Sequence, residues 1–429
     1  MTKSVETTRS LILHPDLKLS DARGEPQHAL AEAVSLASAL NLDVVDAKVV
    51  PVSKPKAGTL FGSGKVDEIA SFCKAEEIDL VLVDGPVSPI QQRNLEKAWN
   101  VKLLDRTGLI LEIFGDRAAT REGVLQVDLA QLTYQKSRLV RSWTHLERQR
   151  GALGFIGGPG ETQIEADRRA IDDQIVRIRK QLAKVVKTRK LHRAARAKVP
   201  YPIVALVGYT NAGKSTIFNR MTGASVLAKD MLFATLDPTM RSIELPSGRK
   251  VILSDTVGFI SDLPTQLVAA FRATLEEVLD ADLILHIRDI SHPQSDKQSA
   301  DVLEILTELG ISENAEEGMI EVWNKIDAVS AERGHTLELI ASREPQKVAV
   351  SALTGSGIET LCEVIEDGLA DVTHEDEVEI DYSDGHARAW LFERNVVTNE
   401  AQSETGYTLS VNWSDKQRNQ FRQLQSRTA

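Results

Sequence analysis

Gly208-Tyr-Thr-Asn-Ala-Gly-Lys-Ser215 directly follows an apolar run, Ile203–Val207, and opens a segment with helical character. The segment matches the pattern G-x-x-x-x-G-K-[ST], whose glycines let successive backbone N–H groups turn inward around phosphates at a helix N-terminus. We expect Lys214 to reach the β- and γ-phosphates and the Ser215 hydroxyl to bind Mg2+. A strand, a glycine-rich loop and a helix in this order predict a P-loop within a nucleotide-binding α/β sheet.

A second signature, Asn324-Lys-Ile-Asp327, follows another apolar run. A carboxylate at Asp327 can accept hydrogen bonds from N1–H and from the exocyclic amine of guanine, whereas adenine offers no matching pair of donors. Such sites discriminate strongly, because the wrong base leaves a buried acceptor unpaired. We expect Asn324 to brace the loop and the stem of Lys325 to lie along the base. Together with the P-loop, this signature predicts GTP rather than ATP.

A third element, Asp255-Thr-Val-Gly258, ends the apolar run Val251–Asp255. Asp255 has the position of a Walker-B acid and is expected to hold Mg2+ through water, while the Gly258 amide senses the γ-phosphate. Loss of that phosphate would release the loop, as in a conformational switch. The next residue, Phe259, cannot orient water as the glutamine found there in many GTPases does. We therefore expect slow intrinsic turnover that depends on a partner.

Two further segments complete the expected site. Phe233-Ala-Thr-Leu-Asp-Pro-Thr239 lies between the P-loop and Asp255, and either Thr235 or Thr239 could complete Mg2+ coordination in the GTP state. Ser351-Ala-Leu353 follows the last expected strand and would place backbone amides near the guanine O6.

Periodicity and composition divide the chain into four regions, at residues 1–120, 121–199, 200–372 and 373–429. The first alternates β-branched runs (Leu42–Val52, Leu80–Asp84) with helical stretches (Val66–Glu76, Ile90–Trp99), which predicts a small α/β domain. The third contains the nucleotide motifs and predicts a doubly wound, mostly parallel sheet. Its expected strands are Ile203–Val207, Val251–Asp255, Leu283–Asp289, Ile320–Asn324 and Val348–Ser351, with an edge hairpin over Met240–Leu245 and Arg249–Leu253.

The second region predicts two long helices joined by a glycine-rich tip. Leucines from Leu125 to Leu146 and apolar residues from Ile171 to Val185 recur at helical spacing. Gly151–Gly160 separates them and cannot be helix interior, because Gly and Pro dominate it. The fourth region begins with the acidic run His374–Glu379 and alternates over Ala387–Phe392 and Tyr407–Trp413, which suggests a small α/β appendage.

Composition is that of a globular protein, with 42% hydrophobic and 26% charged residues and a net charge of −11. No apolar run is long enough to span a membrane, and the N-terminus has no secretion signal. Cys73 and Cys362 have no partners at metal-ligand spacing, so we expect two buried thiols in a reducing compartment. We expect a cytoplasmic monomer without stable membrane insertion, and leave peripheral membrane association open.

Charge is unevenly distributed along the chain. Residues 136–198 carry 17 Lys or Arg against 6 Asp or Glu, and no acidic residue interrupts the ten basic ones between Arg177 and Lys198. A solvated helix face would explain a shorter charge run. This run favours contact with the phosphates of structured RNA, in a manner that weakens steeply with salt.

These motifs and their order resemble translation-factor-related GTPases and, more specifically, the HflX family of ribosome-associated GTPases. The similarity is carried by Phe233–Thr239, by Asp255-Thr-Val-Gly-Phe-Ile260 and by Gly157-Gly-Pro-Gly-Glu-Thr-Gln-Ile-Glu-Ala-Asp-Arg-Arg169. The stretches Gly58–Lys65 and Arg106–Phe114 look similar too. The resemblance covers most of residues 10–370 and is weakest in the C-terminal appendage.

The resemblance implies a metal ligand and a partner. In the family, the threonine of the Phe-Ala-Thr-Leu-Asp element binds Mg2+, which favours Thr235 as the ligand here, beside Ser215. Members bind the large (50S) ribosomal subunit and are implicated in splitting stalled or idle ribosomes under stress. Related GTPases that lack the glutamine bind a catalytic K+ ion through an asparagine at the position of Asn211. Leu353 departs from the usual lysine after Ser-Ala, which removes stacking on the base but leaves backbone contacts.

Residues and resemblance together define the expected site. Lys214, Thr235 and Gly258 are expected to act in catalysis. The nucleotide is expected to contact Gly208, Tyr209, Thr210, Asn211, Ala212, Gly213, Lys214, Ser215, Thr216, Phe233, Ala234, Thr235, Leu236, Asp237, Asp255, Thr256, Val257, Gly258, Asn324, Lys325, Ile326, Asp327, Ser351, Ala352 and Leu353.

Two other features have weaker signals. Gly62-Ser-Gly-Lys65 could bind phosphate, but a strand-to-helix turn explains it better, and His286 and His292 are expected to be structural.

The leading hypothesis is a GTPase that docks on ribosomal RNA in its GTP state and separates the subunits. The alternative is a GTP-controlled switch acting on protein or membrane partners. No catalytic Cys or metal cluster supports a modifying enzyme.

Overall fold

The computed structural model of the chain describes residues 7–17, 25–149, 159–196, 201–224, 233, 239–261, 278–279, 281–311, 318–369, 373–382, 384–394, 396–403, 406–414, 418 and 421–422. Side chains are described for these residues except 140–149, 159–164, 188–196 and a few positions in the last 60 residues. The chain forms two compact units, Met1–Val364 and Ile365–Ala429.

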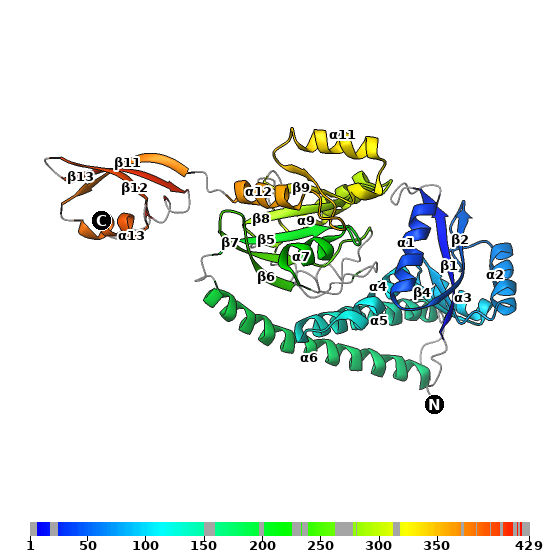
Figure 1. The fold of residues 1–429 in the computed structure, drawn as a ribbon. Coiled ribbons are helices and arrows are strands. Elements are labelled where there is room, and N and C mark those ends of the chain that lie inside the picture. Colours follow the sequence, from blue (N-terminus) through cyan, green and yellow to red (C-terminus); the bar gives the residue numbers. More distant parts are fainter. Residues whose placement is uncertain are drawn as a thin grey trace, which may run out of the picture. The chain divides into compact units, whose positions relative to one another are not determined.

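The N-terminal part of the first unit is a parallel four-stranded sheet in the order β2-β1-β3-β4, flanked by helices (Figure 1). Its elements are β1 (Arg9–Leu17), α1 (Pro26–Ala39), β2 (Asp43–Val52), α2 (Ser63–Ala75), β3 (Leu80–Val83), α3 (Pro89–Trp99), β4 (Lys102–Asp105) and α4 (Arg106–Arg117). The expected alternation of strands and helices is therefore confirmed. Because Asp105 both ends β4 and caps α4 by accepting from the Gly108 amide, Arg106 is fixed at the edge of the sheet.

The two long helices predicted next are α5 (Arg121–Gln149) and α6 (Pro159–Arg196), which pack against each other. Lys136 of α5 pairs with Asp172 of α6. Residues 151–158 of the expected tip lie outside the described residues. Pro159 and Gly160, expected in the tip, instead begin α6, where proline is favoured because the first N–H groups of a helix have no intrahelical partner.

A six-stranded sheet in the order β10-β9-β8-β5-β7-β6 follows, parallel except for β6. Its strands are β5 (Ile203–Gly208), β6 (Thr239–Glu244), β7 (Lys250–Asp255), β8 (Leu283–Asp289), β9 (Ile320–Asn324) and β10 (Lys347–Ala349). The helices are α7 (Lys214–Thr222), α9 (Ser295–Glu308), η2 (Ile326–Ala328), α11 (Ala331–Ala341) and α12 (Ile358–Gly368) (Figure 1). The doubly wound sheet and its antiparallel edge hairpin are as the sequence predicts.

One hydrophobic cluster joins the two sheets of the first unit. It combines residues of the N-terminal sheet and its helices, such as Ile12 and Phe114, with residues around the P-loop, such as Phe233, Phe259 and Val302. A separate cluster on the other face of the N-terminal sheet contains Phe61, Trp99 and Cys73. The N-terminal region therefore packs on the P-loop region through a shared core.

The second unit is a three-stranded antiparallel sheet in the order β11-β13-β12, with one described helix against it. Its elements are β11 (Thr373–Asp381), α13 (Gly385–Glu393), β12 (Val397–Gln402) and β13 (Gly406–Ser414). The segment Ala387–Phe392 lies within α13. Ala387 and Leu391 are four residues apart, so they lie on the same face of the helix, and both are buried in the core of this unit.

Two further expectations concern cysteines and membranes. Cys73 is buried whereas Cys362 is partly exposed, so the expectation of two buried thiols holds for Cys73 alone. Within the described residues, none of the helices combines the length and apolar character that crossing a bilayer requires.

Candidate functional site

The sequence motifs meet at the carboxyl edge of the six-stranded sheet. Gly208 ends β5, Asp255 ends β7, Asp289 ends β8 and Asn324 ends β9, and these four strands are adjacent. Ligands of open parallel sheets bind at this edge, because the loops that follow the strands converge there. The topology therefore brings together residues that are up to 116 positions apart in the sequence.

The P-loop connects β5 to α7 through residues with left-handed backbone conformations. Asn211 has a φ of 60° and Gly213 a φ of 96°. A Cβ at Gly213 would lie 2.1 Å from Nδ2 of Asn324, so only glycine lets the loop approach the end of β9 this closely. Lys214 then begins α7, and its N-terminal amides face the loop.

Lys214 is buried inside this loop. Its Nζ donates to the carbonyl oxygens of Gly208, at 3.1 Å, and Tyr209, at 2.9 Å. Burial lowers the pKa of the ammonium to about 8, against the opposing effect of Asp255. A phosphate in the loop would supply the negative charge that this buried cation needs.

Ser215 and Asp255 form the oxygen pair expected at a metal site. Ser215 Oγ donates to Asp255 Oδ2 over 2.7 Å. Hydroxyl and carboxylate oxygens on neighbouring elements suit Mg2+, which prefers oxygen ligands and retains several waters. The adjacent Thr256 is buried and donates its hydroxyl to the Leu206 carbonyl at 2.6 Å, so its side chain holds β7 to β5.

Gly258 lies against the P-loop. An ideal Cβ on Gly258 would be 2.9 Å from Thr210 Cα and 3.0 Å from Lys214 Nζ, so no side chain fits there. The following residue, Phe259, is buried, and its backbone pairs with the loop: its amide donates to the Gly208 carbonyl at 3.1 Å, and its carbonyl accepts from the Thr210 amide at 2.7 Å. The Phe259 ring belongs to the core and offers no polar group to water.

Asn324 joins three loops at the base end. Its Nδ2 donates to the Ala212 carbonyl at 2.8 Å, and its Oδ1 accepts from the Ala352 amide at 3.0 Å. Asn324 therefore bridges the P-loop and the loop at 351–353. Arg220 of α7 adds a second link, because it donates to the carbonyls of Ala352 and Leu353.

The other residues of the base end are placed differently. Lys325 has a φ of 67°, and its ammonium lies 2.8 Å from Asp289 Oδ2. Asp327 is exposed in η2. Ser351 is buried and accepts from the Thr354 amide at 3.1 Å, whereas the Leu353 side chain is 76% exposed. The loop thus presents its backbone, and Leu353 points a bare apolar side chain to solvent.

The expected threonine segment is described only at its two ends. Ala234, Thr235, Leu236 and Asp237 lie outside the described residues, and Thr239 begins β6. Phe233 is buried with a φ of 58°, and its ring packs edge-on against Phe114 of α4, at 4.6 Å between centroids. Its side chain therefore contacts the N-terminal region, although the sequence placed it among the nucleotide-binding residues.

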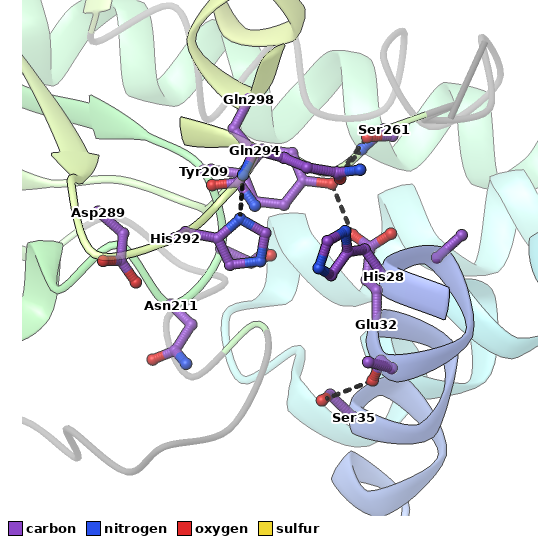
Figure 2. A pocket seen from close by; sticks show the side chains of 13 residues that line it. His28, Glu32, Ser35, Tyr209, Asn211, Ser261, Asp289, His292, Gln294 and Gln298 are labelled. Carbon is purple, nitrogen blue, oxygen red and sulfur yellow. Dashed lines mark hydrogen bonds between the residues drawn. The ribbon is translucent and has the colours of Figure 1, made fainter. Parts of the chain in front are cut away.

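A polar cavity of about 210 Å³ lies beside the P-loop (Figure 2). It is lined on one side by α1, with His28 and Glu32, and on the other by Asn211, Asp289 and His292. The His28 and His292 rings lie 6.0 Å apart across it, and burial lowers the pKa of His292. The sequence does not predict the contribution of α1, because no motif marks it and it lies about 180 residues before the P-loop.

Four family models match consecutive parts of the chain. Their descriptions are "GTP-binding GTPase N-terminal" for residues 27–115, "GTP-binding GTPase Middle Region" for 117–196, "50S ribosome-binding GTPase" for 203–325 and "HflX C-terminal domain" for 336–427. The last match includes the appendage, where the sequence resemblance is weakest.

Relatives match over nearly the whole length. The protein "GTPase HflX" of Magnetococcus marinus is 48% identical over 400 residues, which are 93% of this chain and 91% of the relative. The Escherichia coli protein of the same name is 41% identical over 377 residues, which are 88% and 87% of the two chains. A solved structure, SsGBP in complex with GDP, covers 84% of this chain and 98% of its own at a TM-score of 0.50 and 22% identity, which shows a similar fold.

Proposed function

This chain belongs to the HflX family of GTPases and hydrolyses GTP, and from this premise we propose that it binds the large ribosomal subunit in its GTP state and dissociates stalled or idle ribosomes. Hydrolysis then releases it. We place this activity in the cytoplasm under stress and propose that the protein acts as a monomer. The four regions at 1–120, 121–199, 200–372 and 373–429 are proposed as its domains.

The basic face of α6 carries the ribosome proposal. From Arg177 to Lys187 its basic residues are all exposed: Arg177, Arg179, Lys180, Lys184 and Lys187. The alternative is a solvated helix face, and in either case exposure leaves these side chains at the surface, where they can meet phosphate. A stiff helix with this charge fits the backbone of structured RNA, because the phosphates dominate the affinity of such contacts.

We assign the nucleotide-site residues the following roles. Lys214 contacts the β- and γ-phosphates, Gly258 senses the γ-phosphate, and Asp327 reads guanine while Asn324 fixes the loop. Ser215 and Thr235 hold Mg2+, with Asp255 behind them; when bound, the ion neutralises charge on the phosphate oxygens. The 2.7 Å contact of Ser215 with Asp255 supports this assignment.

Slow intrinsic hydrolysis follows from the position of Phe259. Its ring is buried and its backbone is held by the P-loop, so it cannot orient the attacking water. We propose that ribosome binding supplies the missing help. Asn211, with its left-handed backbone, is proposed to bind K+, and equal hydrolysis rates in K+ and Na+ would contradict this role.

Pelleting with purified 50S subunits tests the ribosome proposal. We expect binding with a non-hydrolysable GTP analogue but not with GDP, and a steep loss of affinity with salt. Arg179→Gln/Lys180→Gln should lower the slope of log K against log salt by about 2, because each lost phosphate contact lowers it by about 1.

Lys250→Gln/Arg343→Gln is the matched control, since it removes two exposed charges elsewhere on the first unit. If both variants lower the salt slope equally, binding depends on the overall charge of the protein and not on the basic residues of α6. If the protein binds ribosomes in neither nucleotide state, the proposal is rejected. That result would favour the alternative, a GTP-controlled switch acting on protein or membrane partners.

A further inference from the structure

Ser261 stands at the contact between the nucleotide site and the N-terminal region. It lies three residues after Gly258, and its backbone is held on both sides: its amide donates to the Tyr209 hydroxyl at 2.9 Å, and its carbonyl accepts from Arg106 Nη2 at 2.9 Å. Its own hydroxyl donates to Asp301 Oδ2 of α9 at 2.7 Å. The segment after Gly258 is therefore tied to the P-loop, to α4 and to α9 at one residue.

Tyr209 is the P-loop side of this contact. Its hydroxyl donates to Glu32 Oε1 of α1 at 2.6 Å and lies 2.8 Å from Ser261 Oγ (Figure 2). Burial, and then the charge of Glu32, raise the pKa of this phenol well above its ordinary value, so the hydroxyl keeps its proton. The phosphate-binding loop thus uses its second residue to bind α1 and the Ser261 segment at once.

Arg106 makes the N-terminal side rigid. It is buried, and its guanidinium bonds Asp84 Oδ1 at 2.8 Å and Glu32 Oε2 at 3.1 Å. Burial alone would lower the pKa of Arg106, but Glu32 and Asp84 together raise it above its ordinary value. A permanently charged group held by two carboxylates has little freedom to move, so Glu32 offers Tyr209 a fixed acceptor.

We propose that Tyr209 is a positioning residue for the response to the γ-phosphate. With Glu32, Arg106 and Ser261 it forms what we call the Tyr209 clamp, which holds residues 258–261 closed on the P-loop. In this position Gly258 lies beside Lys214, where its amide can meet the γ-phosphate. The clamp therefore favours bound GTP over bound GDP, and it does so only while α1 and α4 are docked on the P-loop region.

The opposite segment of the site supports this proposal. Phe233, two residues before Thr235, packs on Phe114 of α4, the helix that begins with Arg106. One helix of the N-terminal region therefore contacts Phe233, which precedes the expected Mg2+ ligand Thr235, and Ser261, which follows Gly258. By thermodynamic linkage, whatever strengthens the docking of α4 also strengthens GTP binding, and GTP strengthens the docking in return.

Tyr209→Phe in the full chain tests the clamp, because it removes one hydroxyl and keeps the ring. The affinities of a fluorescent GDP and of a fluorescent non-hydrolysable GTP analogue are measured at equilibrium. We expect the preference for the GTP analogue over GDP to fall about tenfold, as for the loss of a buried hydrogen bond to a charged group. Glu32→Ala should lower the preference in the same direction, and the double variant should lower it no further than the larger single effect.

Tyr382→Phe is the control. The Tyr382 hydroxyl donates to the Ser403 carbonyl at 2.9 Å, and both residues belong to the second unit. The variant should leave the preference unchanged. Equal losses of affinity for both nucleotides in Tyr209→Phe would show a merely structural role, and a stronger preference for the GTP analogue would show that the clamp holds the GDP state; either result overturns the proposal.

Discussion

The two ends of the nucleotide site are built in different ways. At the base end, Asn324 links the P-loop to the loop at 351–353, and Arg220 links the same loop to α7, so every contact lies within one sheet and its helices. At the phosphate end, contacts are made by Glu32, Arg106 and Phe114, which belong to the helices of the N-terminal sheet. We therefore expect the base end to recognise guanine without the N-terminal region, and the phosphate end to require that this region is docked.

The base end should lose its specificity through a single side chain. Asp327→Asn replaces an acceptor with an amide that cannot accept from both guanine donors, so GTP affinity should fall by about 10³-fold or more. Xanthosine triphosphate, which presents a carbonyl in place of the exocyclic amine, should then bind better than GTP. Competition binding with GTP and xanthosine triphosphate measures this change of preference. An unchanged order of preference would mean that Asp327 does not read the base.

The sheet beneath both ends should lose stability in acid through His286. Burial lowers its pKa to about 4, so between pH 6.5 and pH 4 the unfolded chain binds a proton that the folded chain does not. The stabilisation by neutral His286 is present above pH 6.5 and is lost as the pH falls towards 4, by up to about 3 kcal/mol.

Thermal unfolding of the wild type and His286→Gln across this pH range checks the expectation. Each protein is compared with its own value at pH 7.5, and the variant should show a flatter decline. His335→Gln, at an exposed histidine of α11, serves as the control and should decline as the wild type does. Parallel curves for all three proteins would assign the acid sensitivity to other groups.

The phosphate end should respond more weakly to Phe114→Leu. This change keeps the apolar bulk but removes the edge-on contact with Phe233, a contact worth about 0.5–1.5 kcal/mol. We expect the affinity for a non-hydrolysable GTP analogue to fall about threefold, with a smaller change for GDP. Phe61→Leu makes the same substitution in the cluster on the far face of the N-terminal sheet, beside Trp99, and should change neither affinity. Equal effects of the two variants would mean that the Phe233 contact does not reach the nucleotide.

The difference between the two ends also explains what the sequence could predict. The P-loop, Asp255-Thr-Val-Gly258 and Asn324–Asp327 have fixed spacings within one sheet, so local pattern and strand order place them. Glu32 and Arg106 are about 100–180 residues from Tyr209, and no fixed spacing links them to it, because their partners are set by the packing of one sheet region on another. Phe233 shows the same limit: its motif predicts a nucleotide contact, while packing turns its ring into the shared core.

Sedimentation of purified 70S ribosomes with the protein tests whether the protein separates the ribosomal subunits. A sucrose gradient separates 70S particles from free subunits after incubation with GDP or with a non-hydrolysable GTP analogue. We expect 70S particles to be converted to 30S and 50S subunits only with the GTP analogue, and the protein to migrate with the 50S peak. Intact 70S particles in both nucleotide states, with the protein at the top of the gradient, would contradict this expectation.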